Sequence, residues 1–141
     1  MKLAHILLVE DNEGDIVLTK DAFTECKIKT DLSVARNGQE ALDFLFKRGE
    51  FVEAQVPDLI LLDINIPIFN GHEVLTKIKA DPTLKKIPVI MLTTSSHKKD
   101  MDKAYDKHCN SYVLKPLKIA DFIEAIIKIE QFWLQLSSLP K

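Results

Sequence analysis

Short apolar runs alternate along the chain with stretches in which apolar residues recur at helical spacing. Strands separated by helical stretches are typical of βαβ units, in which helices cover both faces of a parallel sheet. The pattern therefore predicts an α/β domain built on a doubly wound sheet of five parallel strands. The five predicted strands are HILLVE (5–10), LSVAR (32–36), LILLD (59–63), PVIML (88–92) and SYVL (111–114).

The helical stretches are recognised by apolar residues that share one face. Such faces are formed by Ala41, Leu42, Leu45 and Phe46, and by Val74, Leu75 and Ile78. Asn37 precedes Glu40 by three residues, which is the spacing of a capping box. A helix is therefore expected to begin at Asn37.

The last helical stretch is unusually long. Its apolar residues predict one helix over about 118–137. These residues are Ile119, Phe122, Ile123, Ile126, Phe132, Trp133, Leu134 and Leu136. The residues from Phe132 onward spread around more of the helix than one core-facing stripe needs, which indicates a second buried surface. In the alternative, Trp133 folds back over its own domain.

Length and charge limit the classes of protein to consider. A chain of 141 residues fits one domain. With no repeat or Gly/Ser linker, residues 1–141 are expected to form a single domain without an attached output domain. The net charge of -2 gives no electrostatic reason to expect binding to DNA or to a membrane surface. The amino-terminal apolar run is too short for a signal peptide. Cys26 and Cys109 are far apart and do not show the spacing of a disulfide framework, so a cytoplasmic protein is expected.

Polar residues follow the predicted strands. In a parallel sheet the carboxyl ends of the strands lie at one edge, where ligands bind, so these residues should meet there. The set consists of Glu10, Asp11, Asp63, Asn65, Thr93, Thr94 and Lys115.

This combination suits phosphoryl transfer onto an aspartate. Carboxylates that lie close together repel one another unless a cation is present, and all-oxygen ligands favour Mg²⁺. A lysine can neutralise a phosphoryl oxygen, a threonine hydroxyl can donate to another, and a carboxylate can act as the nucleophile. The sequence therefore predicts an aspartyl phosphate formed in a Mg²⁺-dependent reaction.

The segments LLVEDN, LILLDINIP, VIMLTTS and YVLKP resemble, in this order, the motifs of response-regulator receiver domains of two-component signalling. The resemblance covers nearly the whole chain. It implies a flavodoxin-like fold with strand order 2-1-3-4-5. It also implies a signalling domain rather than an enzyme, which takes a phosphoryl group from the phosphohistidine of a sensor histidine kinase and then switches a protein-interaction surface.

The resemblance also implies a role for each residue of the set. Asp63 would be the phosphoacceptor and Lys115 would pair with the phosphoryl group, held by Pro116, which resembles the cis-proline of the family. Thr93 and Tyr112 would move together as the switch. The remaining roles are metal binding by Glu10, Asp11, Asp63 and the backbone carbonyl of Asn65, and control of access to the phosphoryl group by Asn65 and Thr94.

Two further features are similar to the stand-alone regulators that partner bacterial phytochrome kinases. These are the long connection before LILLD and the tail IEQFWLQLSSLP. The similarity implies a phytochrome-type kinase as partner and a homodimer through the C-terminal helix region. The downstream contact would be a target protein or a phosphotransfer protein.

Two other functions use the same residues. A phosphatase of the haloacid dehalogenase type also forms an aspartyl phosphate, but it needs a carboxylate two residues after the nucleophile, where this chain has Asn65. A receiver-like binding module that takes no phosphate would have no reason to hold Glu10, Asp11 and Asp63 together.

Overall fold

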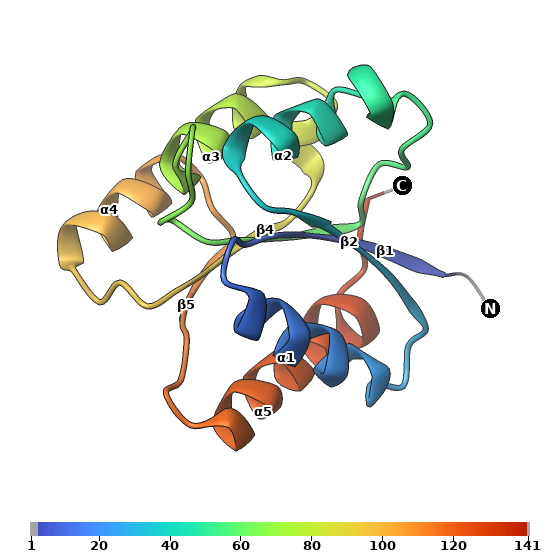
Figure 1. Cartoon of the computed structure of the whole chain (residues 1–141), viewed down its shortest axis with the longest axis vertical. Helices are drawn as coiled ribbons and strands as arrows, with labels where there is room; N and C mark the ends of the chain where they lie inside the picture. The colour runs from blue at the N-terminus through green and yellow to red at the C-terminus, as the bar shows by residue number, and fades with distance from the viewer. Residues whose placement is uncertain (1–2, 141) are drawn as a thin grey trace.

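The computed structural model describes residues 3–140. Its centre is a sheet of five parallel strands, which lies between two layers of helices (Figure 1). The strand order is β2-β1-β3-β4-β5, and every neighbouring pair is parallel. This confirms the predicted sheet and its order. The strands are β1 (Ala4–Val9), β2 (Thr30–Ala35), β3 (Leu59–Leu62), β4 (Val89–Thr93) and β5 (Ser111–Leu114).

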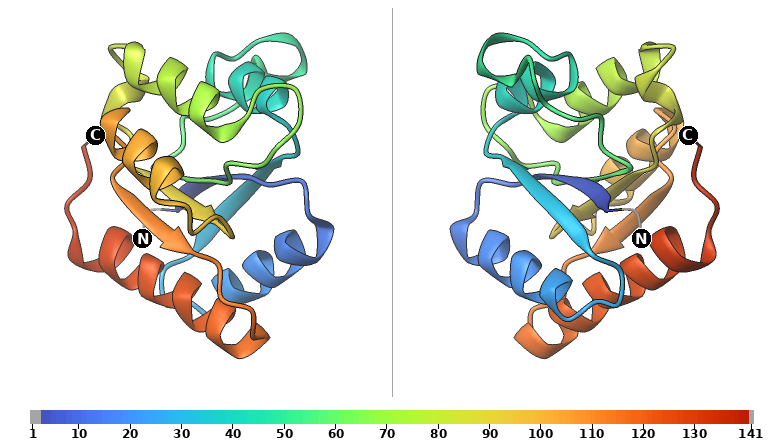
Figure 2. Two further views of the ribbon diagram at one scale, coloured as in Figure 1. Left: turned by 90° about the vertical axis from the view of Figure 1, so that its left-hand side faces the viewer. Right: turned by 90° about the vertical axis from the view of Figure 1, so that its right-hand side faces the viewer.

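Five α-helices cover the two faces of the sheet. One face carries α1 (Glu13–Thr24) and α5 (Ile119–Glu130), which pack against each other (Figures 1 and 2). The opposite face carries α2 (Gly38–Leu45), α3 (Gly71–Ala80) and α4 (Lys98–Asp106). Both faces are therefore shielded from water, as a doubly wound parallel sheet requires.

The central strand β3 shows why the apolar runs are continuous. All four of its residues are fully buried, because side chains alternate between the two covered faces. Leu59 and Leu61 pack in the core beneath α1 and α5, whereas Ile60 and Leu62 pack in the core beneath α2 and α3. Tight packing on both sides therefore holds the backbone of β3 rigidly.

Asparagine side chains begin three of the helices. Asn12, Asn37 and Asn70 each accept a hydrogen bond from a backbone amide in the first turn of the helix that follows. At Asn37 this bond comes from Glu40, as the spacing predicts, but the reciprocal bond of a full capping box is present at Asn70 and Glu73 instead.

Two apolar residues predicted to lie on buried helix faces are more exposed than expected. Phe46 is 37% exposed because α2 ends at Leu45, and the Phe46 ring lies beneath the guanidinium of Arg48 instead. Ile119 is 62% exposed because it is the first residue of α5, ahead of the turns in which Phe122 and Ile126 reach the core.

The C-terminal segment continues beyond α5 in a different geometry. A π-helical segment, Gln131–Leu136, follows directly where a single helix over about 118–137 is predicted. The side chain of Gln135 donates to the buried carboxylate of Glu130 at 2.6 and 2.9 Å. Trp133 packs partly against the core of its own domain, while Phe132 and Leu136 stay 50% and 76% exposed.

Within residues 3–140, no helix combines the length and the apolar character that crossing a membrane would need.

Candidate functional site

The carboxyl ends of the strands place three charged side chains at one edge of the sheet. The backbone amide of Glu10 bonds to Ala35 at 2.9 Å and that of Asp63 bonds to Val9 at 3.1 Å. The amide of Lys115 bonds to Thr93 at 2.8 Å. Each bond extends a strand ladder by one residue, so the side chains of Glu10, Asp63 and Lys115 project from rigid backbone.

A close backbone contact holds α3 against this edge. A Cβ atom on Gly71 would lie 2.3 Å from the carbonyl oxygen of Asp63, which is too close for any side chain. The Gly71 amide also donates to Ile64 at 2.8 Å. The segment after Asp63 is therefore bound tightly to the first turn of α3.

The ammonium of Lys115 is the centre of the site. Its Nζ donates to Oδ2 of Asp63 at 2.9 Å and to Oδ2 of Asp15 at 2.9 Å, and it also bonds to Oε1 of Glu10. Lys115 and Glu10 are almost completely buried, and Asp63 is only 7% exposed. All three N–H donors of the ammonium have a carboxylate partner, so one buried cation holds three carboxylates together.

Asp15 is the site residue that the sequence analysis missed. It lies in the first turn of α1, where the cap formed by Asn12 accepts from its backbone amide at 2.9 Å. It also lies four residues after Asp11, which puts it one helical turn beyond the strand end. That spacing could have indicated a carboxylate aimed back at the site.

Burial and charge act in opposite directions on Glu10. Burial and the charge of Asp63 raise its pKa, the hydrogen bond from Lys115 lowers it, and the net result is a pKa of about 7. For Lys115, burial alone would lower the pKa, but the bond to Glu10 and the charge of Asp63 raise it above the usual lysine value. The lysine is therefore charged at neutral pH, and Glu10 protonates more readily than an ordinary glutamate.

The acidic residues were also predicted to bind Mg²⁺. Within residues 3–140, no three His, Cys, Asp or Glu side chains are grouped closely enough to hold a metal ion. Lys115 lies between Glu10 and Asp63, and Asp11, which follows Glu10 in the sequence, is exposed. The donor set nevertheless fits this ion, because the carboxylates of Glu10 and Asp63 already converge on one cation and offer it oxygen ligands.

Two residues that lie shortly after Asp63 and Thr93 in the sequence are more exposed than these two. Asn65 is exposed, and its amide donates to Oδ1 of Asp63 at 3.4 Å. Thr93 is fully buried, whereas Thr94 is exposed. Asn65 and Thr94 are thus open to solvent.

Tyr112 and Thr93 meet at Ser95. The Tyr112 hydroxyl donates to the carbonyl oxygen of Ser95 at 2.8 Å, so the ring lies inward against the loop between β4 and α4. Oγ1 of Thr93 accepts from the Ser95 amide at 3.3 Å. Among residues 3–140 the Thr93 hydroxyl donates to no partner, so its proton can bind another acceptor.

The expected cis peptide before Pro116 is not found, because every peptide bond among residues 3–140 is trans. Lys115 reaches its three carboxylates from this backbone, held by its amide bond to Thr93. The expectation from the resemblance is wrong at this position.

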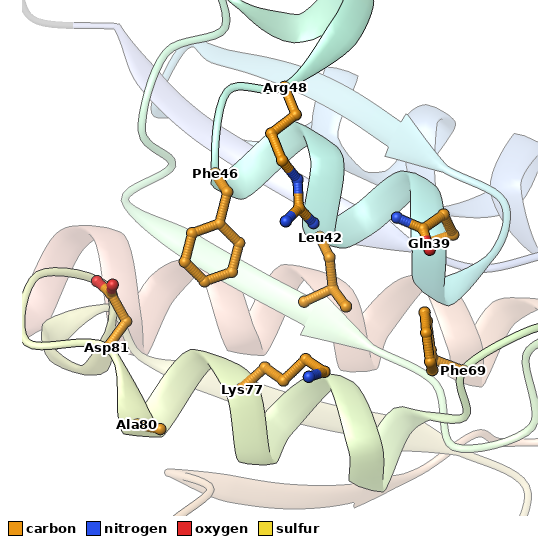
Figure 3. A pocket seen from close by; sticks show the side chains of 8 residues that line it. All are labelled: Gln39, Leu42, Phe46, Arg48, Phe69, Lys77, Ala80 and Asp81. Atoms are coloured by element: carbon orange, nitrogen blue, oxygen red, sulfur yellow. The ribbon is translucent and has the colours of Figure 1, made fainter.

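A separate hollow of about 460 Å³ lies between α2 and α3, away from the acidic edge (Figure 3). None of the predicted site residues lines it. Figure 3 shows the side chains of Phe46 and Leu42 on one side of the hollow and the side chain of Lys77 across from them. The chemistry predicted from the sequence belongs to the sheet edge, where the charged groups converge.

Comparison with known proteins agrees with the fold and with the order of the motifs. A model of the response regulator receiver domain matches residues 6–127. The chain belongs to the response-regulator receiver family. The protein therefore acts in two-component signalling, and its sheet has the strand order of a receiver domain.

Two regulators, Rcp1 and RcpA, match this chain over nearly their whole length. The response regulator Rcp1 of Synechocystis sp. is 41% identical over 135 residues, which cover 96% of this chain and 92% of Rcp1. The phosphorylated cyanobacterial phytochrome response regulator RcpA superposes with a TM-score of 0.97 at 41% identity, over 99% of this chain and all of RcpA. The Mn²⁺-bound form of Rcp1 gives a TM-score of 0.94 at 40% identity, over 98% of this chain and 99% of Rcp1. The chain thus resembles phytochrome-associated receivers over nearly its whole length.

Proposed function

We propose that Asp63 accepts a phosphoryl group from the phosphohistidine of a sensor histidine kinase. The observation that carries this proposal is the bond from the buried Lys115 ammonium to Oδ2 of Asp63 at a strand end. A carboxylate oxygen of Asp63 attacks phosphorus while the bond from phosphorus to the histidine nitrogen breaks. The electron pair of that bond stays on the imidazole ring.

The surrounding residues prepare the site for a dianionic group. Lys115 exchanges part of its carboxylate contacts for a phosphoryl oxygen and neutralises the added charge. Thr93 donates its free hydroxyl proton to a second oxygen, since its own oxygen already accepts from Ser95. Asn65 and Thr94 border the open side and set how readily water reaches the phosphorus.

Magnesium would be held by Glu10, Asp11, Asp63 and the backbone carbonyl of Asn65. When bound, it supplies further positive charge to the oxygens of the transferring group. The similarity to Rcp1, which has been solved with Mn²⁺, supports a divalent cation here.

A small acyl phosphate donor tests the proposal directly. With Mg²⁺, the wild-type protein is expected to gain the mass of one phosphoryl group, and Asp63→Asn is expected to gain none. Asp102→Asn, which changes an exposed aspartate on α4, serves as the matched control and should be phosphorylated like the wild type. Mass gain that persists in Asp63→Asn would contradict the assignment, and sustained release of phosphate over many turnovers would favour the phosphatase.

The kinase partner is proposed to be of the phytochrome type, because RcpA is described as a phytochrome response regulator and matches over the full chain. We place the phosphoryl transfer in the cytoplasm, in keeping with the free thiols of Cys26 and Cys109.

The output of the phosphorylated protein is a contact with a target or phosphotransfer protein rather than with DNA. It is transmitted by Thr93 and Tyr112 to the surface of α4, β5 and α5.

The exposed residues of the C-terminal segment are proposed to form a homodimer. Phe132 and Leu136 are apolar and exposed, and the Phe132 ring packs edge-on against Trp133, with 5.1 Å between the ring centroids.

Leu136→Arg is expected to weaken association at least tenfold, because it places a charge in the buried centre of the interface. Light scattering, with and without phosphodonor, measures this. Val52→Arg, at a residue that is 60% exposed and distant from Leu136 in the sequence, should leave the mass measured by light scattering unchanged. A monomeric wild type at high concentration would rule the dimer out.

A further inference from the structure

His72 is a buried polar residue at the start of α3. Only 4% of its surface is exposed, and its Nε2 lies 3.1 Å from Oδ1 of Asp100 in the first turn of α4. Among the described residues 3–140, its Nδ1 is the one buried side-chain nitrogen or oxygen that lacks a hydrogen-bond partner. A leucine of similar size would leave no unsatisfied atom, so the histidine carries a cost in stability.

Asp100 connects His72 to the loop between β4 and α4. Its second oxygen, Oδ2, accepts from the Ser95 hydroxyl at 2.6 Å. The hydrogen bonds from Ser95 and from His72 lower the pKa of Asp100, so it is a carboxylate at neutral pH. Because a carboxylate only accepts, His72 must donate from Nε2, and both oxygens of Asp100 are engaged.

Ser95 is the residue at which this network meets Thr93 and Tyr112. Its hydroxyl bonds to Asp100, its amide donates to Thr93 and its carbonyl accepts from Tyr112. All its polar groups are thus used, and Ser95 is itself only 9% exposed. A shift of Ser95 would change the surroundings of both Thr93 and Tyr112.

We propose that His72 and Asp100 are positioning residues that hold Ser95 and thereby favour the arrangement in which Tyr112 lies inward and Thr93 is ready to bind a phosphoryl oxygen. This inference rests on the proposed phosphorylation of Asp63. In the inward arrangement the loop already has the form that the phosphoryl group requires, so less of the binding energy is used to reorganise it. His72 acts from α3 without touching Asp63, Lys115 or the metal ligands.

The experiment uses the full chain with Mg²⁺ and beryllium fluoride, which mimics a phosphoryl group on a carboxylate. The beryllium fluoride concentration at half-saturation is measured by NMR for the wild type, His72→Leu, Ser95→Ala and the double variant. The ring signals of Tyr112 are recorded before and after addition. His5→Leu is the matched control, because it removes a second His–Asp pair, at 3.3 Å from Asp31.

His72→Leu is expected to raise the half-saturating beryllium fluoride concentration about tenfold, with Mg²⁺ affinity unchanged. The Tyr112 ring signals should shift even in the unmodified protein. His72→Gln, which keeps an N–H donor for Asp100, should restore the concentration to within about threefold of the wild type. In the Ser95→Ala background, His72→Leu should add almost nothing, because the connection is already broken.

Several results would overturn the proposal. Wild-type behaviour of His72→Leu would do so, as would full additivity of the two substitutions or an equal effect of His5→Leu. If His72→Leu fails to fold, Asp100→Asn and Ser95→Ala test the same connection from its other end. A wild type that binds no beryllium fluoride would contradict the proposed function instead, and the Tyr112 signals of the unmodified variants would still decide whether His72 positions Ser95.

Discussion

Replacing Lys115 by methionine is expected to lower the free energy of unfolding by about 3–5 kcal/mol when no divalent metal is present. The ammonium is the shared partner of Glu10, Asp15 and Asp63, and it is almost fully buried with the first and last of them. Methionine fills a similar volume but leaves these carboxylates facing one another without a cation. Added Mg²⁺ should recover much of the loss, because it supplies positive charge at the same place.

Urea unfolding in EDTA and in Mg²⁺ measures this prediction. Lys98→Met is the matched control, since Lys98 pairs with Asp102 on the surface, and its urea midpoint should not change. The Lys115 variant is also expected to retain Mg²⁺ binding while it loses most of the conformational response to phosphorylation. Unchanged stability in EDTA, or a full response, would show that Lys115 has another role.

The residues of the site could be predicted because strand ends are easy to recognise. Each buried strand is a short apolar run, and the first polar residue after it must lie at the edge of the sheet. Glu10, Asp63 and Lys115 were found in this way, and their side chains converge as expected. The strand order came from the resemblance to receiver domains, because short βαβ connections limit the possible topologies without selecting one of them.

Other features depend on contacts that no local pattern records. Asp15 is a polar residue in the first turn of a helix and could equally be a solvent-exposed one. The connection of His72 to Ser95 through Asp100 joins two helices and a loop that are distant in sequence. The end of α2 before Phe46 is equally hidden, because the apolar pattern continues beyond the last helical residue. Such features can be identified only in the folded structure.

Glu10 should make stability depend on pH in a way that is unusual for a carboxyl group. Its pKa is raised from 4.5 to about 7 by burial, so the folded state binds a proton more tightly than the unfolded state. The stabilisation from this proton is complete below about pH 4.5 and is lost as the pH rises through about 7. In EDTA, the free energy of unfolding should therefore lose up to about 3 kcal/mol from this group over that interval.

The variant Glu10→Gln isolates this contribution, because glutamine is neutral at every pH and has nearly the shape of protonated glutamate. The difference in unfolding free energy between wild type and variant should fall steadily from pH 4.5 to pH 7, whatever the histidines contribute to both. Glu13→Gln, at an exposed residue paired with Arg36, should keep the wild-type slope. If Glu10→Gln also keeps that slope, Glu10 is ionised in the folded protein throughout this range, and the bond from Lys115 outweighs the cost of its burial.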